Sequence, residues 1–263
     1  MKIKKIAIVF FSPTDSTRTV LEQMAESLHF PVERIDITPS AQRENDHHFT
    51  SDTLVFLGAP VYGGRIPALA VESMQKIHGQ QTPAVLVVTY GNRAYEDALL
   101  EMQEIVEPNG LLPIAAAALV TEHSIMHSVA CGRPDAEDKQ SIMAFMARVE
   151  KKIQNAQSIA DFARVEVPGN HPYREYGGAA LKPKATRACS QCGICAAQCP
   201  AAAIPVDHPE KTDHDRCISC MRCMKVCPVQ ARKLPALLLS AAEKAFAAKY
   251  SARKEPAFFT GSH

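Results

Sequence analysis

The sequence predicts an α/β protein in which a doubly wound parallel sheet is followed by a small cysteine-rich domain. Two observations predict the sheet. Short apolar runs recur through about the first 160 residues, and segments with helical periodicity separate them. A third observation concerns the rest of the chain, where eight of the nine cysteines lie between positions 189 and 227.

Five apolar runs are expected to form the strands of the parallel sheet, since each is short and bounded by turn residues. In chain order they are 6–11, 32–37, 52–58, 84–89 and 111–120. The first run follows basic residues, as in a signal peptide, but it has only six residues and no small-residue cleavage site after it. We therefore interpret it as a strand.

Helices are expected between the strands. The segments with helical spacing are 16–28, 67–77, 95–106 and 135–156, and an Ala/Leu segment at 236–250 predicts one more. Pro67 suits the first turn of its helix. The predicted domains are a sheet domain at 1–163, a Pro/Gly-rich linker at 164–187, a cysteine-rich domain at 188–234, and a C-terminal helix with a tail at 235–263.

Composition narrows the function. The formal net charge of +1 gives no long-range field for nucleic acid or an anionic membrane. No apolar run reaches the roughly 18 residues of a membrane-spanning helix. Eight clustered cysteines in a chain without an export signal indicate metal binding in a reducing cytoplasm rather than a disulfide scaffold.

The cysteines form two copies of C-x2-C-x2-C-x3-C-P, at 189–200 and 217–228. Zinc also binds four cysteines, but zinc sites generally use cysteine pairs rather than triplets with a fourth residue. The pattern resembles the bacterial two-cluster [4Fe–4S] ferredoxins. This resemblance implies a small α+β domain with two crossed ligand sets, in which Pro200 and Pro228 turn the chain. The sets are Cys189, Cys192, Cys195 and Cys227 for one cluster, and Cys217, Cys220, Cys223 and Cys199 for the other. The ninth cysteine, Cys131, is expected to be a buried apolar residue.

A hydroxyl-rich turn, S-P-T-D-S-T at 12–17, joins the first strand to the first helix, which suits an anion. It resembles the phosphate loop of the flavodoxin family. The resemblance implies that FMN phosphate contacts Ser12, Thr14, Ser16 and Thr17. Asp15 stands where that family usually has Gly. Asp tolerates left-handed backbone angles, but its charge repels phosphate unless the side chain points to solvent or Arg18 offsets it.

Two further loops follow strands at the same edge of the sheet and resemble the flavodoxin loops beside the flavin ring. The implied contacts are Pro60, Tyr62, Gly63, Gly64, Thr89, Tyr90, Gly91, Asn92, Arg93 and Tyr95. Tyr62 is expected to stack on the ring, Arg93 to stabilise negative charge on the reduced flavin, and Tyr95 to cover the ring or the phosphate. The alternative is that these are ordinary β/α turns, because glycine-rich turns alone are weak signals.

A fourth loop, 121–128, contains His123 and His127. A role in substrate binding or proton relay is one interpretation. The preferred interpretation is a surface loop with solvated histidines.

Taken together, the chain resembles the flavodoxin–ferredoxin fusion proteins of anaerobic bacteria and archaea. The resemblance implies an electron-transfer protein that relays low-potential electrons between two [4Fe–4S] clusters and FMN, with redox proteins as partners. One alternative is a flavin-dependent reductase of a quinone or nitro compound that is fed through its clusters. Another is a flavin-free docking domain fused to a ferredoxin. A carrier or oxidoreductase component is expected rather than a stand-alone enzyme, and no G-x-G-x-x-G motif supports direct NAD(P)H oxidation.

Overall fold

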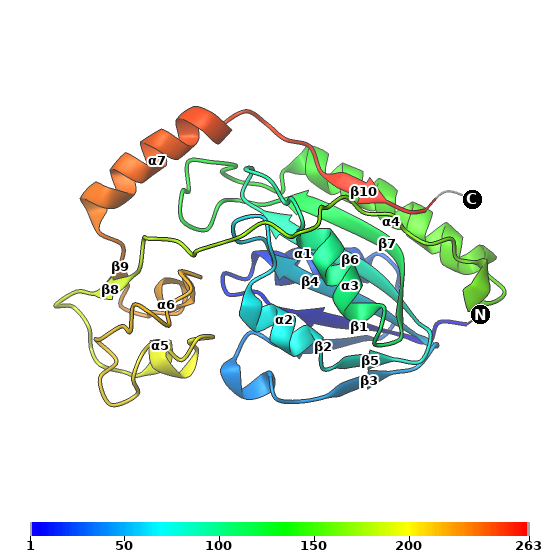
Figure 1. The fold of residues 1–263 in the computed structure, drawn as a ribbon, viewed down its shortest axis with the longest axis horizontal. Helices are drawn as coiled ribbons and strands as arrows, with labels where there is room; N and C mark the ends of the chain where they lie inside the picture. The colour runs from blue at the N-terminus through cyan, green and yellow to red at the C-terminus, as the bar shows by residue number, and fades with distance from the viewer. Residues whose placement is uncertain (1, 262–263) are drawn as a thin grey trace.

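The computed structural model describes residues 2–261, and its centre is a twisted parallel sheet (Figure 1). Its parallel strands are β1 (Lys5–Phe10), β2 (Val32–Asp36), β4 (Thr53–Pro60), β6 (Thr82–Tyr90) and β7 (Leu111–Val120). They lie in the order β7-β6-β4-β1-β2. Counted along the chain, these five strands have the order 2-1-3-4-5, which is the flavodoxin-like doubly wound topology. The predicted fold class is confirmed.

Helices cover both faces of this sheet, because alternate residues of each strand point to opposite faces. On one face, Ile6 and Ile8 pack in one apolar cluster with helices α1 (Ser16–Glu26) and α4 (Ala136–Asn155). On the other face, Ala7 and Val9 belong to the cluster that contains residues of α2 (Ala68–Met74) and α3 (Ala98–Val106). Pro67 lies at the N-cap of α2, one position before its first turn.

A sixth strand extends the sheet where the sequence predicts a tail. Strand β10 (Ala257–Phe259) pairs antiparallel with β7 at Ala116–Ala118. The ring of Phe258 stacks on that of Phe145 in α4, with the centroids 4.8 Å apart. The predicted tail is thus partly a strand, because its aromatic residues find an apolar partner on a distant helix.

Small elements complete the described chain. Two short parallel strands, β3 (His47–Phe49) and β5 (Ile77–Gly79), form a separate sheet, so α2 ends earlier than predicted. The cysteine-rich region contains α5 (Ile194–Ala197), α6 (Arg222–Lys225) and the antiparallel pair β8 (Lys184–Ala185) and β9 (Arg232–Lys233). Single 3₁₀ turns are Ser40–Gln42 and Ile159–Asp161. None of the helices within residues 2–261 is both long enough and apolar enough to cross a membrane.

The segment predicted as a linker, 164–187, lies against the sheet domain. The buried carboxylate of Asp97 accepts hydrogen bonds from the backbone N–H groups of Asn170, at 2.9 Å, and Arg174, at 2.7 Å. The Gln103 side chain donates to the carbonyl of Val165 at 3.0 Å. These contacts fix the path of the segment from α4 to the cysteine-rich region.

Helix α7 (Ala236–Tyr250) leads from the cysteine-rich region back toward the sheet domain (Figure 1). None of its residues is buried, and Leu237 is 88% exposed. Its sequence-predicted bounds are confirmed. The cysteine-rich region also contacts the sheet domain directly, since the Arg43 guanidinium donates to the carbonyl of Pro200.

Candidate functional site

A cavity of about 270 Å³ lies beyond the carboxyl ends of the central strands. The loops after β1, β4, β6 and β7 form its base. Its other walls come from residues far along the chain: Tyr176 and Ala179 of the linker, Ile218 and Ser219 of the cysteine-rich region, and Phe246 of α7. The predicted flavin-loop residues that line it are Ser12, Thr14, Ser16, Thr17, Pro60, Tyr62, Gly63, Thr89, Tyr90, Gly91 and Arg93.

The hydroxyl-rich loop has free donors at the start of α1. The backbone N–H groups of Thr14, Ser16 and Thr17 have no hydrogen-bond partner among residues 2–261, as expected where a helix begins. The Ser12 hydroxyl accepts from the backbone N–H of Arg18 at 3.1 Å, which closes the loop. A phosphate group would satisfy the free donors, so the loop fits the predicted FMN phosphate.

Asp15 adopts the left-handed conformation that Gly has in such loops, with φ of 69°. Although its neighbours line the cavity, Asp15 does not. Its Oδ1 lies 3.3 Å from Nη1 of Arg222 in α6 and 3.6 Å from Nη2 of Arg18. The negative charge is therefore offset by two arginines, one of which belongs to the cysteine-rich region.

Three predicted flavin contacts lie outside the cavity lining, namely Gly64, Asn92 and Tyr95. The Asn92 amide is buried and donates to the carbonyls of Tyr250, at 2.6 Å, and Ala252, at 2.8 Å. Tyr95 packs on Tyr90, with ring centroids 5.4 Å apart. Asn92 thus holds the end of α7, a contact that the sequence did not predict, and its contact with the flavin ring stays a prediction.

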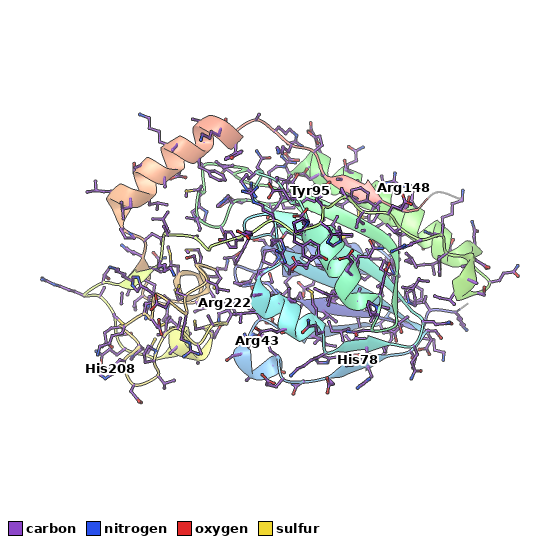
Figure 2. All side chains as sticks on the ribbon, in the orientation of Figure 1. Arg43, His78, Tyr95, Arg148, His208 and Arg222 are labelled. Carbon is purple, nitrogen blue, oxygen red and sulfur yellow. The ribbon has the colours of Figure 1, made fainter. Side chains whose placement is uncertain are left out.

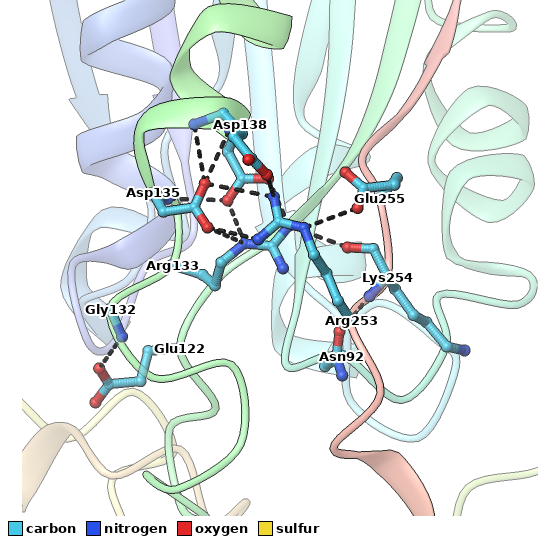
Figure 3. A network of polar contacts seen from close by, with 10 residues as sticks. Asn92, Glu122, Gly132, Arg133, Asp135, Asp138, Arg253, Lys254 and Glu255 are labelled. Atoms are coloured by element: carbon cyan, nitrogen blue, oxygen red, sulfur yellow. Dashed lines mark hydrogen bonds and ion pairs between the residues drawn. The ribbon is translucent and has the colours of Figure 1, made fainter.

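A network of charged residues fixes the chain after α7 to the sheet domain (Figure 3). Arg253 binds the carboxylate of Asp135, at 2.5 Å, and Arg133 binds that of Asp138 at the start of α4. The hydrogen bond from Arg253 holds the pKa of Asp135 well below its usual range. Because α7 is fixed at this end, its Phe246 stays over the cavity.

In the two loops predicted to lie beside the flavin ring, Tyr62, Tyr90 and Arg93 interact with other parts of the protein. Burial raises the pKa of Tyr62 well above its ordinary value and that of Tyr90 to about 12, so both phenols keep their protons. The Arg93 guanidinium binds the Glu96 carboxylate at 2.6 and 3.2 Å. The charge predicted to face a reduced flavin is therefore paired with a carboxylate.

His123 is part of the cavity wall, so the expectation of a solvated side chain was wrong for this residue. Its Nδ1 accepts from the backbone N–H groups of Ile125, at 3.1 Å, and Met126, at 3.0 Å. Burial lowers its pKa to about 4. The imidazole is neutral at neutral pH, with its proton on Nε2 as a donor. His127 behaves as expected, with a side chain that is 64% exposed.

The eight clustered cysteines surround two hollows. One is lined by Cys189, Cys192, Cys195 and Cys227, and the other by Cys199, Cys217, Cys220 and Cys223. The fourth cysteine of each sequence motif therefore lies with the triplet of the other motif. Within residues 2–261 no three His, Cys, Asp or Glu side chains meet in the way that a lone metal ion requires.

The thiols are suited to a positively charged group. Burial raises the pKa of Cys220 and Cys223 to about 12, so their thiolates need a cationic partner such as cluster iron. The Sγ atoms of Cys199 and Cys227 each accept one backbone N–H, at 3.3 and 3.2 Å. Cys131, expected to be buried, is exposed.

A family model described as a 4Fe-4S binding domain matches residues 210–233. None of the curated proteins matches the chain.

Three solved flavodoxins are similar in structure. One is from the domain Archaea, with 12% identity, a TM-score of 0.38, and coverage of 57% of this chain and 99% of that one. Another is from Streptococcus pneumoniae TIGR4, with 16% identity, a TM-score of 0.39, and coverage of 56% and 98%. Flavodoxin 2 from Bacillus cereus has 14% identity, a TM-score of 0.41, and coverage of 56% and 99%. On its own strand order and its family match, the chain is a fusion of a flavodoxin-like fold with a 4Fe-4S ferredoxin segment.

Proposed function

We propose that the protein relays low-potential electrons between two [4Fe–4S] clusters and FMN. The observation that carries this proposal is the position of Ile218, which lines both the flavin-loop cavity and the hollow of Cys217 and Cys220. A flavin and a cluster at these places would be separated by little more than one side chain. FMN exchanges one or two electrons and each cluster exchanges one.

On this proposal the sheet domain holds FMN by its two ends. The free N–H groups of Ser16 and Thr17 bind the phosphate at the start of α1. Tyr62 and Tyr90 border the ring, and Gly91 allows the close approach of His123, because a Cβ at position 91 would lie 2.5 Å from the imidazole Cδ2.

The residues that cover the cavity define where electrons enter. Tyr176 of the linker and Phe246 of α7 lie over the loops, which limits direct access of another protein to the ring. Cys192 in the other hollow is exposed. We therefore expect a redox protein partner to exchange electrons with the cluster beside Cys192, and the second cluster to connect it to the flavin. The many free thiols favour a reducing, cytoplasmic environment.

The test is a cofactor analysis. The full chain is purified without oxygen, extracted with acid, and assayed for flavin, iron and sulfide per chain. We expect about one FMN and about eight irons, the content of two cubane clusters. The same iron content without flavin, even after FMN is added, would refute the relay and leave a docking domain fused to a ferredoxin.

A second candidate function is a flavin-dependent reductase of a quinone or nitro compound. The observation that favours it is the neutral His123, whose Nε2 is a proton-bearing donor in the cavity wall. Oxidation of the reduced protein by a quinone should then be saturable, and His123→Asn should slow it about tenfold or more. Second-order kinetics that the variant leaves unchanged would favour the carrier.

A further inference from the structure

We infer that Arg222 is a positioning residue through which the cluster nearest the cavity controls FMN binding. This inference rests on the proposed function. Arg222 lies at the junction of the cysteine-rich region and the sheet domain (Figure 2). It links two sites that are separated by about 200 residues in the sequence.

The contacts of Arg222 join cluster ligands to the phosphate loop. It lies between Cys220 and Cys223 in the sequence, and its side chain is only 16% exposed. Nη1 donates to the carbonyl of Pro13 at 3.2 Å and to Oδ1 of Asp15 at 3.3 Å. Nη2 donates to Oε1 of Gln198 at 2.7 Å.

The contact with Gln198 strengthens the connection to one cluster. Gln198 directly precedes Cys199, and Cys199, Cys220 and Cys223 line the same hollow. Arg222 itself directly precedes Cys223, and its guanidinium is held by Gln198, the residue before Cys199, so two cysteines of one hollow adjoin this contact. Its position depends on the arrangement of those ligands.

The contact with Asp15 matters because of charge. A phosphate monoester carries almost two negative charges at pH 7, and Asp15 directly precedes the free N–H groups that would bind it. Without Arg222, the carboxylate keeps, among residues 2–261, only the partner Arg18, at 3.6 Å, with a side chain that is 43% exposed. Repulsion between the carboxylate and the phosphate would then weaken FMN binding.

The cluster controls this contact because the cysteine-rich region has only a small apolar core of its own. Its own apolar cluster contains few buried residues, and these are Cys195, Ala196, Cys199, Ala203 and Ile204. Domains this small generally need metal to fold, so the binding free energy of the cluster is also folding free energy. Loss of the cluster should release α6 and withdraw Arg222 from Asp15. FMN affinity should then fall for two reasons, the loss of the Ile218 and Ser219 wall and the exposure of the Asp15 carboxylate, and only the second depends on Arg222.

The first experiment measures the dissociation constant of FMN by flavin fluorescence, for the full chain with clusters and after their removal by a chelator and an oxidant. We expect cluster removal to weaken FMN binding at least about fivefold in the wild type, the lower end of typical coupling between sites. In Asp15→Asn, which has no carboxylate to expose, only the loss of the Ile218 and Ser219 wall remains, so cluster removal should weaken FMN binding about fivefold less than in the wild type. Equal weakening in both proteins would overturn the inference.

A double-mutant cycle tests the same contact with the clusters in place. Arg222→Gln should weaken FMN binding at least about fivefold, while Asp15→Asn/Arg222→Gln should bind like Asp15→Asn alone. Iron and sulfide content is checked in each variant. The control is Arg216→Gln, which removes an exposed arginine beside Cys217 and should leave FMN affinity unchanged.

The results separate the inference from the proposed function. A wild-type protein that binds no FMN refutes both. A wild type that binds FMN with an affinity independent of Arg222 and of the clusters refutes only the role of Arg222. If Arg222→Gln fails to assemble its clusters, the comparison of wild type with Asp15→Asn still decides the question.

Discussion

The half-buried His123 should make the protein less stable as pH falls below neutrality. Burial is the main cause of its lowered pKa, which is about 4 instead of the ordinary 6.5. Between these two pH values the unfolded chain takes up a proton at this position and the folded chain does not. Stability therefore falls by about 1.4 kcal/mol per pH unit over the interval, or about 3 kcal/mol by pH 4. Above pH 6.5 the effect disappears.

The direct assay is hydrogen–deuterium exchange at the imidazole C2 position of the full chain, followed by mass spectrometry across a pH series. Peptide fragmentation separates His123 from His127. We expect the His123 midpoint near pH 4. A midpoint at pH 6 or above would show that the ring is solvated and would refute the arrangement around the cavity.

The variant His123→Asn tests the predicted loss of stability at low pH. In His123→Asn the amide oxygen can accept the same N–H groups as Nδ1, but it does not titrate. The difference in unfolding free energy between wild type and variant should change by about 3 kcal/mol from pH 7 to pH 4. His127→Asn, on the exposed part of the same loop, is the matched control. A constant difference across this range would contradict the burial of His123.

Three further predictions test the cavity, the cluster pairing and the tail. Gly91→Ala should displace His123, since the new Cβ meets its ring at 2.5 Å, and should cost about 1–3 kcal/mol of FMN binding or stability in a fluorescence titration and an unfolding curve. Cys227→Ala should lower iron from about eight to about four per chain, while a small chemical reductant still reduces the flavin through the cluster beside the cavity, and Cys131→Ala should keep all the iron. Loss of flavin reduction in Cys227→Ala would contradict the crossed ligand sets. Asn92→Ala removes two hydrogen bonds that hold the end of α7. The free energy of local opening there, measured by amide hydrogen exchange, should fall by about 1–3 kcal/mol.

Local patterns predicted most of the fold. The strand runs and the Ala/Leu segment of α7 carry their own periodicity, and the observed bounds of α7 agree with it. The misses involve partners that are distant in the chain. The predicted helix 67–77 extends too far, because Ile77 begins a strand that pairs with His47–Phe49. The Ala257–Phe259 strand depends on an edge of the sheet supplied by β7.

The residues of the candidate site also fall into two groups, those recognised from local sequence and those that depend on distant contacts. Hydroxyl spacing and cysteine spacing are local, so most of the predicted residues lie around the cavity and the two hollows. The role of Asn92 is not local, because its amide binds carbonyls 158 and 160 residues away. Nor does the loop 121–128 contain a sign that His123 meets Phe246 of α7, with ring centroids 4.8 Å apart.

Asp15 shows why a departure from a family pattern cannot be judged within its own motif. Considered with its neighbours alone, the carboxylate argues against a phosphate site, since only Arg18 is near it in the sequence. Its second partner, Arg222, is 207 residues away and lies between cluster ligands. The arginine that offsets Asp15 here therefore comes from the ferredoxin segment. In this chain Asp15 gives the phosphate loop a contact with the cluster segment, and this makes the substitution compatible with the proposed flavin site.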